Sequence, residues 1–399
     1  MHLKTLEALQ QTTTNPLRPT ASASRHPIST GGILSKASTV AVLVLGQLSL
    51  GSAVGAPAPE TVTADDDFRA GSSVTVSGNG FGTTGPEIVL FEDFESGSAG
   101  ERVSLDSPYI GRWSSTESEA TLVSDGRSGN RSARVYEGGS HGLMRFTLPR
   151  TEREIFLSYW VYVPPGTRFP GDTSGPGEFS SDSSWKFAWI MDTSQGFHSN
   201  GLYDLVAPTF TGGHTFQIAG NSYRPGNRYP GNSWWSWDNW MRISVHLRDP
   251  NRAGASGYGT FEVVSAGQGY HLHQFNASSD PIPFDSHQYD RVNFPGWIRS
   301  GGSSNVRPQY DDIYVSIGNG AAARVELVDA PRYSDASRIE LLLVDSWSDS
   351  SITATVPPSA DLDSGDGWYV FVTHADGSRN SQGVTLCPDC PKPPVLLGD

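Results

Sequence analysis

The sequence predicts an all-β protein in which a small β-sandwich is interrupted by a much larger one. Of its 399 residues, 44 are glycine and 27 are proline, while only 18% are charged. This composition is typical of short strands joined by tight turns rather than of helical bundles. Strand-sized apolar runs resembling two halves of one small sandwich occur in residues 71–90 and 319–386. A chain of this length also exceeds the roughly 250 to 300 residues that one core normally serves.

The first part of the chain, residues 1–56, is predicted to be a signal or export region. Lys36 precedes an apolar run at residues 40–50, and the small residues 54–56 suit the positions before a signal-peptidase cleavage site. The run is shorter than the roughly 20 residues of a membrane span, so we expect a secreted or cell-surface protein without stable membrane insertion. A permanent anchor is the alternative, and a start codon assigned too far upstream would explain the long segment before Lys36. Residues 57–70 are predicted to be a linker.

The small sandwich is predicted from two separated parts. Residues 74–82 read as an alternating strand that runs into a glycine-rich turn, and three more strand-sized runs lie within residues 319–386. Together the parts resemble an IPT/TIG domain, which has an immunoglobulin-like fold. The resemblance rests on Val-Thr-Val-Ser-Gly-Asn-Gly-Phe-Gly at 74–82, Trp-Ser-Asp-Ser-Ser-Ile at 347–352 and Tyr-Val-Phe-Val at 369–372. The alternative is that these are generic sandwich strands.

Beyond this domain lies a C-terminal tail at residues 387–399 with two cysteines, Cys387 and Cys390. Since a second such pair is missing, the Cys-Pro-Asp-Cys spacing favours a local disulfide or a point that tethers the tail over half of a zinc site.

The interrupting segment, residues 91–318, contains many strand-sized runs and no helical period, which predicts a sandwich or jelly roll. It resembles the concanavalin A-like lectin and glucanase superfamily, which includes plant lectins, glycoside hydrolases and jelly-roll polysaccharide lyases. The resemblance rests on the motifs EDFE, LSYWVYVP, SWKFAW, WMRISVH and YDDIY, which begin at residues 92, 157, 184, 240 and 310. The resemblance implies a carbohydrate as the partner.

The net charge and the aromatic residues also favour a carbohydrate as the partner. A net charge of −14 disfavours nucleic acid, which is bound by clustered Lys and Arg. Trp234, Trp235 and Trp237 lie in one short stretch, and their flat faces suit the apolar faces of sugar rings. We therefore predict that these three bind substrate. The alternative is core packing, above all for Trp240 next to them.

The sequence also constrains the chemistry. Related glucanases carry Glu-x-Asp-x-x-Glu on one strand, but here no Glu is followed two residues later by Asp, which disfavours that hydrolytic machinery. A polysaccharide lyase instead needs a group that neutralises a uronate carboxylate, a base and an acid. Residues 214–224 carry such groups at strand spacing. The predicted catalytic residues are His214, Gln217, Asn221, Tyr223, Arg224 and Lys186, and Arg228, His271 and His273 join the predicted substrate-binding residues.

The strand Gln217-Ile-Ala219 resembles the Gln-Ile-His strand of jelly-roll alginate lyases. Ala219 stands where the resemblance implies histidine, so the base is left unassigned and Tyr223 or another histidine would have to serve. The alternative is that these polar residues satisfy hydrogen bonds of turns and strands.

A structural calcium ion is predicted at Asp93, Asp311 and Asp312, which come together if the first and last strands of the insert are neighbours. Carboxylate oxygens are the ligands that calcium prefers, and the resemblance implies such an ion. The alternative is a hydrogen-bond network at the strand ends.

The leading hypothesis is a secreted or surface polysaccharide lyase that acts by β-elimination on a uronate-containing glycan. The alternatives are a non-catalytic glycan-binding or adhesive surface protein and a structural extracellular protein.

Overall fold

The computed structural model describes residues 56–64, 68–135, 143–164, 186–193, 202–206, 215–219, 227–230, 238–248, 258–265, 269–276, 288–296, 307–362 and 367–386. Contacts divide the chain at residue 53, and all described residues belong to the unit that follows it. The predicted export region, apart from its last residue, and both cysteines lie outside the described residues. Within the described part of the chain, no helix is both long and apolar enough to cross a membrane.

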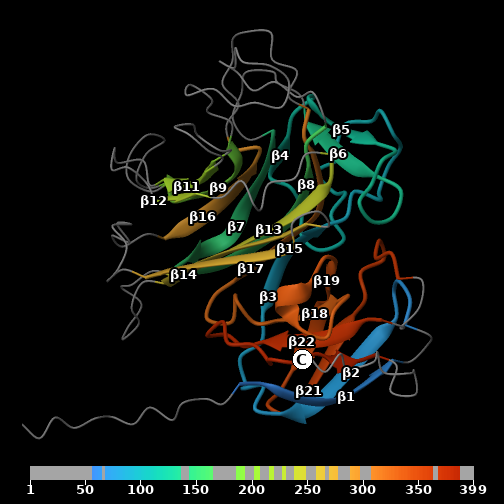
Figure 1. Ribbon diagram of the computed structural model, residues 1–399. Helices are drawn as coiled ribbons and strands as arrows, with labels where there is room; N and C mark the ends of the chain where they lie inside the picture. The colour runs from blue at the N-terminus through green and yellow to red at the C-terminus, as the bar shows by residue number, and fades with distance from the viewer. Residues whose placement is uncertain are drawn as a thin grey trace, which may run out of the picture. The chain divides into compact units, whose positions relative to one another are not determined.

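The small sandwich consists of two four-stranded sheets (Figure 1). One has the order β1-β2-β21-β20, from β1 (Ala58–Ala64), β2 (Ser73–Asn79), β21 (Ser351–Thr355) and β20 (Leu343–Trp347). The other has the order β19-β18-β22-β23, from β19 (Ile339–Leu341), β18 (Arg324–Val328), β22 (Tyr369–Thr373) and β23 (Val384–Thr385). Alternate side chains such as Val74, Val76, Ile352 and Val370 form the core between the sheets.

One strand of this sandwich falls within residues predicted to be a linker. β1 pairs antiparallel with β2 over most of its length, but its burial pattern has a single buried position, Val62. An edge strand with one core residue among Pro, Glu and Thr gives too weak an alternation to be recognised from sequence.

The larger sandwich lies between β2 and β18 in the chain (Figure 1). Its eight-stranded sheet has the order β15-β14-β13-β8-β17-β6-β5, with β3 also paired to β17. Its members are β3 (Glu87–Glu92), β5 (Ala120–Val123), β6 (Ser132–Val135), β8 (Glu154–Tyr162), β13 (Trp240–Arg248), β14 (Tyr258–Ser265), β15 (Gly269–Asn276) and β17 (Gln309–Ile317).

The opposing sheet has seven strands in the order β12-β11-β10-β9-β16-β7-β4. Its members are β4 (Ser115–Thr116), β7 (Met144–Glu152), β9 (Lys186–Met191), β10 (Leu202–Val206), β11 (Thr215–Ala219), β12 (Asn227–Pro230) and β16 (Tyr289–Phe294). Alternate residues such as Leu157, Tyr159, Phe146 and Val292 pack between the two sheets. These sheets confirm the predicted fold class, a jelly-roll β-sandwich inserted in a small immunoglobulin-like β-sandwich.

Buried contacts join the two sandwiches at the outer face of the eight-stranded sheet. Phe156 on β8 and Tyr314 on β17 pack with Leu341 and Leu343 of the small sandwich. Tyr333, in a short 3-10 helix at Tyr333–Asp335, packs its ring edge-on against Tyr270 of β15.

A cluster of buried charges lies among these contacts. The Glu326 carboxylate, on β18, is 2.8 Å from a guanidinium nitrogen of Arg242 on β13 and 3.1 Å from one of Arg324. Glu262 on β14 pairs with Arg324 and with Arg379, each at 3.1 Å. Burial alone would raise the pKa of Glu326, but the surrounding guanidinium groups outweigh it and hold that pKa well below its ordinary value. The two sandwiches thus share one buried ion network.

Candidate functional site

The candidate site is the outer face of the seven-stranded sheet, opposite the face that packs into the core. On β9, Ile190 belongs to the core, whereas Trp189 and Met191 form a separate cluster. On β16, Val292 belongs to the core. Because successive side chains of a strand point to opposite faces, residues 291 and 293 lie on the outer face with residues 189 and 191.

The strand register places chemically distinct side chains side by side on this face. Asn293 on β16 pairs with Arg145 on β7 and with Trp189 on β9. In the next outward-facing row, Arg291 pairs with Thr147 and with Met191. Since neighbouring strands lie about 4.8 Å apart, one amide, two guanidinium groups and one indole occupy adjacent positions on the sheet.

Two polar atoms of this face are buried without a hydrogen-bond partner. Asn293 is 1% exposed, and its Nδ2 donates to the sulfur of Met191 at 3.1 Å. Its Oδ1 has no partner among the described residues, and neither does Nε of Arg291. A buried polar atom left unpaired costs about 1 to 3 kcal/mol, so a polar ligand that pairs with these atoms gains from contacts that the protein itself leaves unmade.

Three of the predicted site residues are aligned on the same sheet. Val206 on β10 pairs in backbone register with Lys186 on β9 and with Gln217 on β11. Gln217 in turn pairs with Arg228 on β12. Lys186, Gln217 and Arg228 therefore lie along one line across four neighbouring strands of the seven-stranded sheet, where the structure describes the backbone.

The position expected to hold the base lies in the row of Asn293 and Trp189. Asp204 on β10 pairs in register with Trp189 and with Ala219 on β11. The row that begins with Arg145, Asn293 and Trp189 thus reaches Ala219, where the alginate-lyase resemblance implies histidine. The alanine side chain supplies no proton-accepting group at this end of the row.

Several predicted residues fall outside the described part of the chain, so their roles stay predictions. These are the predicted catalytic residues His214, Asn221, Tyr223 and Arg224 and the predicted sugar-binding residues Trp234, Trp235 and Trp237. Trp240 begins β13 half-buried, and its ring centroid is 5.6 Å from that of Tyr162. Trp240 therefore packs on the outer face of the eight-stranded sheet rather than in the core.

The two remaining predicted binding residues lie on the other sheet. His271 and His273 are on β15, at the edge of the eight-stranded sheet, and pair in register with Val263 and Phe261. The structure thus does not bring them together with Gln217 and Arg228. Their role in binding stays a prediction.

At the predicted calcium site, β3 pairs with β17, as that prediction required. The buried Asp311 carboxylate accepts hydrogen bonds from the backbone N–H groups of Arg127 and Asp312, at 2.7 and 2.9 Å. The Asp312 carboxylate accepts from the hydroxyl of Ser128 at 2.7 Å and lies 3.2 Å from the Arg127 guanidinium. Burial raises the pKa of Asp311 well above its ordinary value, and the neighbouring Asp312 adds to this rise.

The third residue of that set has a separate partner. Asp93 accepts a hydrogen bond from the backbone N–H of Glu95 at 3.2 Å, and burial raises its pKa to about 6. No group of three or more His, Cys, Asp or Glu residues able to hold a metal ion occurs in the described part of the chain. The contacts fit the hydrogen-bond alternative, and calcium stays a prediction for chelation to test.

Arg145, Trp189, Arg291 and Asn293 were missed as site residues by the sequence reasoning. The signal for two of them was present in Tyr-Asp-Arg-Val-Asn-Phe at Tyr289–Phe294, where Arg291 and Asn293 alternate with apolar core residues. Polar residues at every second position of a strand mark an outward face. Which sheet that strand joins depends on pairing with strands distant in sequence.

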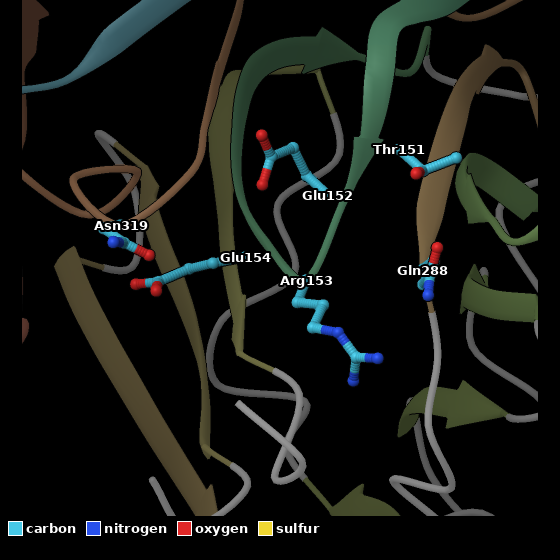
Figure 2. A pocket seen from close by; sticks show the side chains of 6 residues that line it. All are labelled: Thr151, Glu152, Arg153, Glu154, Gln288 and Asn319. Carbon is cyan, nitrogen blue, oxygen red and sulfur yellow. The ribbon is translucent and has the colours of Figure 1, made fainter. Parts of the chain in front are cut away.

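A separate polar pocket of about 250 Å³ lies where β7 turns into β8. It is lined by Thr151, Glu152, Arg153, Glu154, Gln288 and Asn319 (Figure 2). The Glu154 carboxylate pairs with the buried His246 ring at 3.0 Å, and burial outweighs this contact and lowers the pKa of His246. The pocket contains none of the predicted site residues and no aromatic side chain.

Comparisons with known proteins give structural likenesses only. No protein-family model matches the chain, and no curated protein matches it. A PL-14 alginate lyase from Aplysia kurodai is 12% identical with a TM-score of 0.34, covering 50% of this chain and 87% of its own. A Bauhinia forficata lectin solved in complex with GalNAc is 9% identical with a TM-score of 0.31, covering 58% and 97%.

A third likeness is to the CBM2 module of the evolved Dit of Lactobacillus casei BL23 phage J-1. It is 13% identical with a TM-score of 0.30, covering 59% of this chain and 97% of its own. At these TM-scores the likenesses carry no argument about activity, which therefore rests on the residues of the chain itself.

Proposed function

We propose that this protein binds a uronate-containing polysaccharide on the outer face of the seven-stranded sheet and cleaves it by β-elimination. The observation that supports this most is the row in which Asn293 lies between Arg145 and Trp189. Arg291 lies two residues along β16 on the same face. Amide and guanidinium groups pair with carboxylates, and an indole stacks on a sugar ring.

The reaction needs such groups for a definite reason. A base removes the proton at C5 of the uronate, the C4–O bond breaks as a C4–C5 double bond forms, and an acid protonates the leaving oxygen. Negative charge develops on the uronate carboxylate as the proton leaves. Donors placed at that carboxylate stabilise the charge and lower the barrier, and we assign this role to Asn293 and Arg291.

The predicted catalytic residues complete the proposal. Lys186, Gln217 and Arg228 extend the binding face by backbone register. Tyr223 is the proposed base or acid, since Ala219 supplies neither.

The test follows the ultraviolet absorbance of the unsaturated product when the purified chain is incubated with alginate or glucuronan. Arg291→Ala is expected to lower the rate at least about 100-fold, the range for removing one charge-stabilising donor. Arg112→Ala is the matched control because Arg112 is exposed and, in the described part of the chain, forms an ion pair with the exposed Asp106. Equal rates for the two variants would remove Arg291 from the reaction.

A second candidate function is non-catalytic glycan binding, and one observation favours it. Ala219 lies in the row that holds Asn293, Trp189 and Asp204, so this row lacks the histidine that the alginate-lyase resemblance implies as the base. Retention on the polysaccharide with neither unsaturated product nor new reducing ends would support the binding protein over the lyase.

We further infer that the chain is exported and that its small sandwich is of the IPT/TIG type. Support for the second inference is that two motifs of the resemblance touch. The Trp347 indole donates to the backbone oxygen of Phe81 at 3.0 Å and packs edge-on against the Phe81 ring. Gly80 and Gly82 have positive φ, as the glycine-rich turn between them requires.

A further inference from the structure

We propose a second binding site for an acidic oligosaccharide on the outer face of the eight-stranded sheet. It takes its ligand class from the proposed function but uses a different sheet and different residues. The site is a row across five neighbouring strands, named here the cross-strand row: Trp240, Tyr162, Gln309, Arg134 and Thr121.

Each step of the cross-strand row is a register pair. Trp240 on β13 pairs with Tyr162 on β8, which pairs with Gln309 on β17. Gln309 pairs with Arg134 on β6, and Arg134 pairs with Thr121 on β5. The residues that alternate with them, such as Val161, Met241 and Tyr310, belong to the core, so the row faces outward. Four strand spacings give it a length of roughly 19 Å, which suits an extended oligosaccharide rather than a single sugar.

One end of the row is aromatic. The Trp240 and Tyr162 rings are half-buried and lie against each other at 41°. The Tyr162 hydroxyl donates to the Asp238 carboxylate at 2.5 Å, which fixes the ring. Partly exposed aromatic faces held in place by neighbours can stack on a sugar ring at little cost in side-chain entropy.

The other end of the row is cationic. Arg134 and Arg307 line one hollow of about 490 Å³ together with Ser118, Glu119 and Thr121. Glu119 accepts a hydrogen bond from the Ser118 hydroxyl at 2.9 Å. Two guanidinium groups in one hollow stand out in a chain of net charge −14. The planar guanidinium matches a carboxylate through two parallel hydrogen bonds, so the hollow suits a uronate.

The rest of this sheet face explains why the row is separate from the contact between the sandwiches. Farther along β8, Phe156 packs with Leu341 of the small sandwich. Closer to the row, Trp160 is 5% exposed beneath the Arg127 guanidinium, which lies 4.1 Å from its ring centroid. The row begins where this coverage ends, at Tyr162.

The test measures migration of the full chain in native gels that contain alginate, with a neutral β-glucan gel for comparison. Arg134→Glu places a negative charge in the hollow, and because Arg134 is exposed on a surface strand the variant is expected to fold. Its retention in alginate is expected to weaken about tenfold in dissociation constant. Arg112→Glu makes the same charge change at an exposed position outside the row. Relative to its own mobility in a gel without polysaccharide, it is expected to be retarded by alginate as much as the native chain is.

The outcomes separate this site from the proposed function. The second site is overturned if alginate retains Arg134→Glu as strongly as the native chain, or if its retention is weakened no more than that of Arg112→Glu. This holds whether or not Arg291→Ala lowers product formation. The second site is supported if Arg134→Glu is retained more weakly in alginate while its turnover of short oligosaccharides is unchanged. This holds even if Arg291→Ala has no effect on product formation. An equal loss of retention in the neutral glucan overturns the acidic ligand class. Trp240→Ala is the second variant, expected to weaken retention without altering net charge.

Discussion

Replacing Glu326 by glutamine is expected to destabilise the protein more than any exposed charge substitution. Glu326 is fully buried and accepts from Tyr333 Oη at 3.0 Å in addition to its contacts with Arg242 and Arg324. In the native network two carboxylates, Glu326 and Glu262, face three guanidinium groups, those of Arg242, Arg324 and Arg379. After the substitution one carboxylate faces the same three.

The magnitude follows from that imbalance. Removing one partner of a buried ion pair costs about 3 to 5 kcal/mol, because the remaining charge stays buried without compensation. Domains are stable by only about 5 to 15 kcal/mol, so Glu326→Gln removes a large part of the total. The pKa of Glu326 is held below its ordinary value of 4.5. The contribution of Glu326 to stability is therefore present above pH 4.5 and is lost as the pH falls through the lowered pKa.

The assay is urea unfolding near neutral pH, with the midpoint and slope compared between native and variant. Asp106→Asn is the control, since Asp106 and Arg112 form an exposed pair worth about 0 to 1 kcal/mol. A Glu326→Gln variant whose free energy of unfolding lies within about 1 kcal/mol of the native value would refute the reasoning that the buried guanidinium groups depend on the Glu326 carboxylate.

Three further predictions concern single sites. Burial raises the pKa of Glu92 from 4.5 to about 7. The contribution of Glu92 to stability is therefore fully present below its ordinary pKa and is lost as the pH rises through the raised pKa. Between about pH 5 and about pH 8, the free energy of unfolding of the native protein in urea is therefore expected to fall by about 3 kcal/mol relative to that of Glu92→Gln. If the two free energies changed in parallel with pH, the prediction would be contradicted. A chelator is expected to leave the melting temperature unchanged, because the carboxylates of Asp311 and Asp312 already have donors; a fall on chelation would instead support calcium. Gly296→Ala is expected to weaken polysaccharide retention, since a β-carbon there lies 2.4 Å from the Trp189 indole; native retention would place Trp189 outside the binding face.

The fold was predictable because it depends on local patterns. The alternating run Val74–Val76 marks a strand with one buried face, and the mostly apolar run Leu157–Val161 marks a strand that is buried on both faces. Both patterns appear in the sequence itself. β1 was missed because Val62 is its single buried residue.

The candidate site was less predictable because it depends on register between distant strands. Gln217 and Arg228 were recognised from one stretch of sequence, and the pairing of β11 with β12 aligns them. Arg145, Trp189 and Asn293 come from three strands far apart in the chain, and only the pairing of β7, β16 and β9 makes them neighbours. Sequence alone gives no register for such pairs.

Mass spectrometry of the products formed from a uronate polysaccharide tests the central claim most directly. β-elimination predicts oligosaccharides whose new non-reducing ends carry the C4–C5 double bond and lack the elements of water that hydrolysis would add. We expect these products from the native chain and from Arg112→Ala, and a rate lower by at least about 100-fold from Arg291→Ala. Saturated products, or unsaturated products formed equally fast by Arg291→Ala, would contradict the assignment of the reaction to the outer face of the seven-stranded sheet.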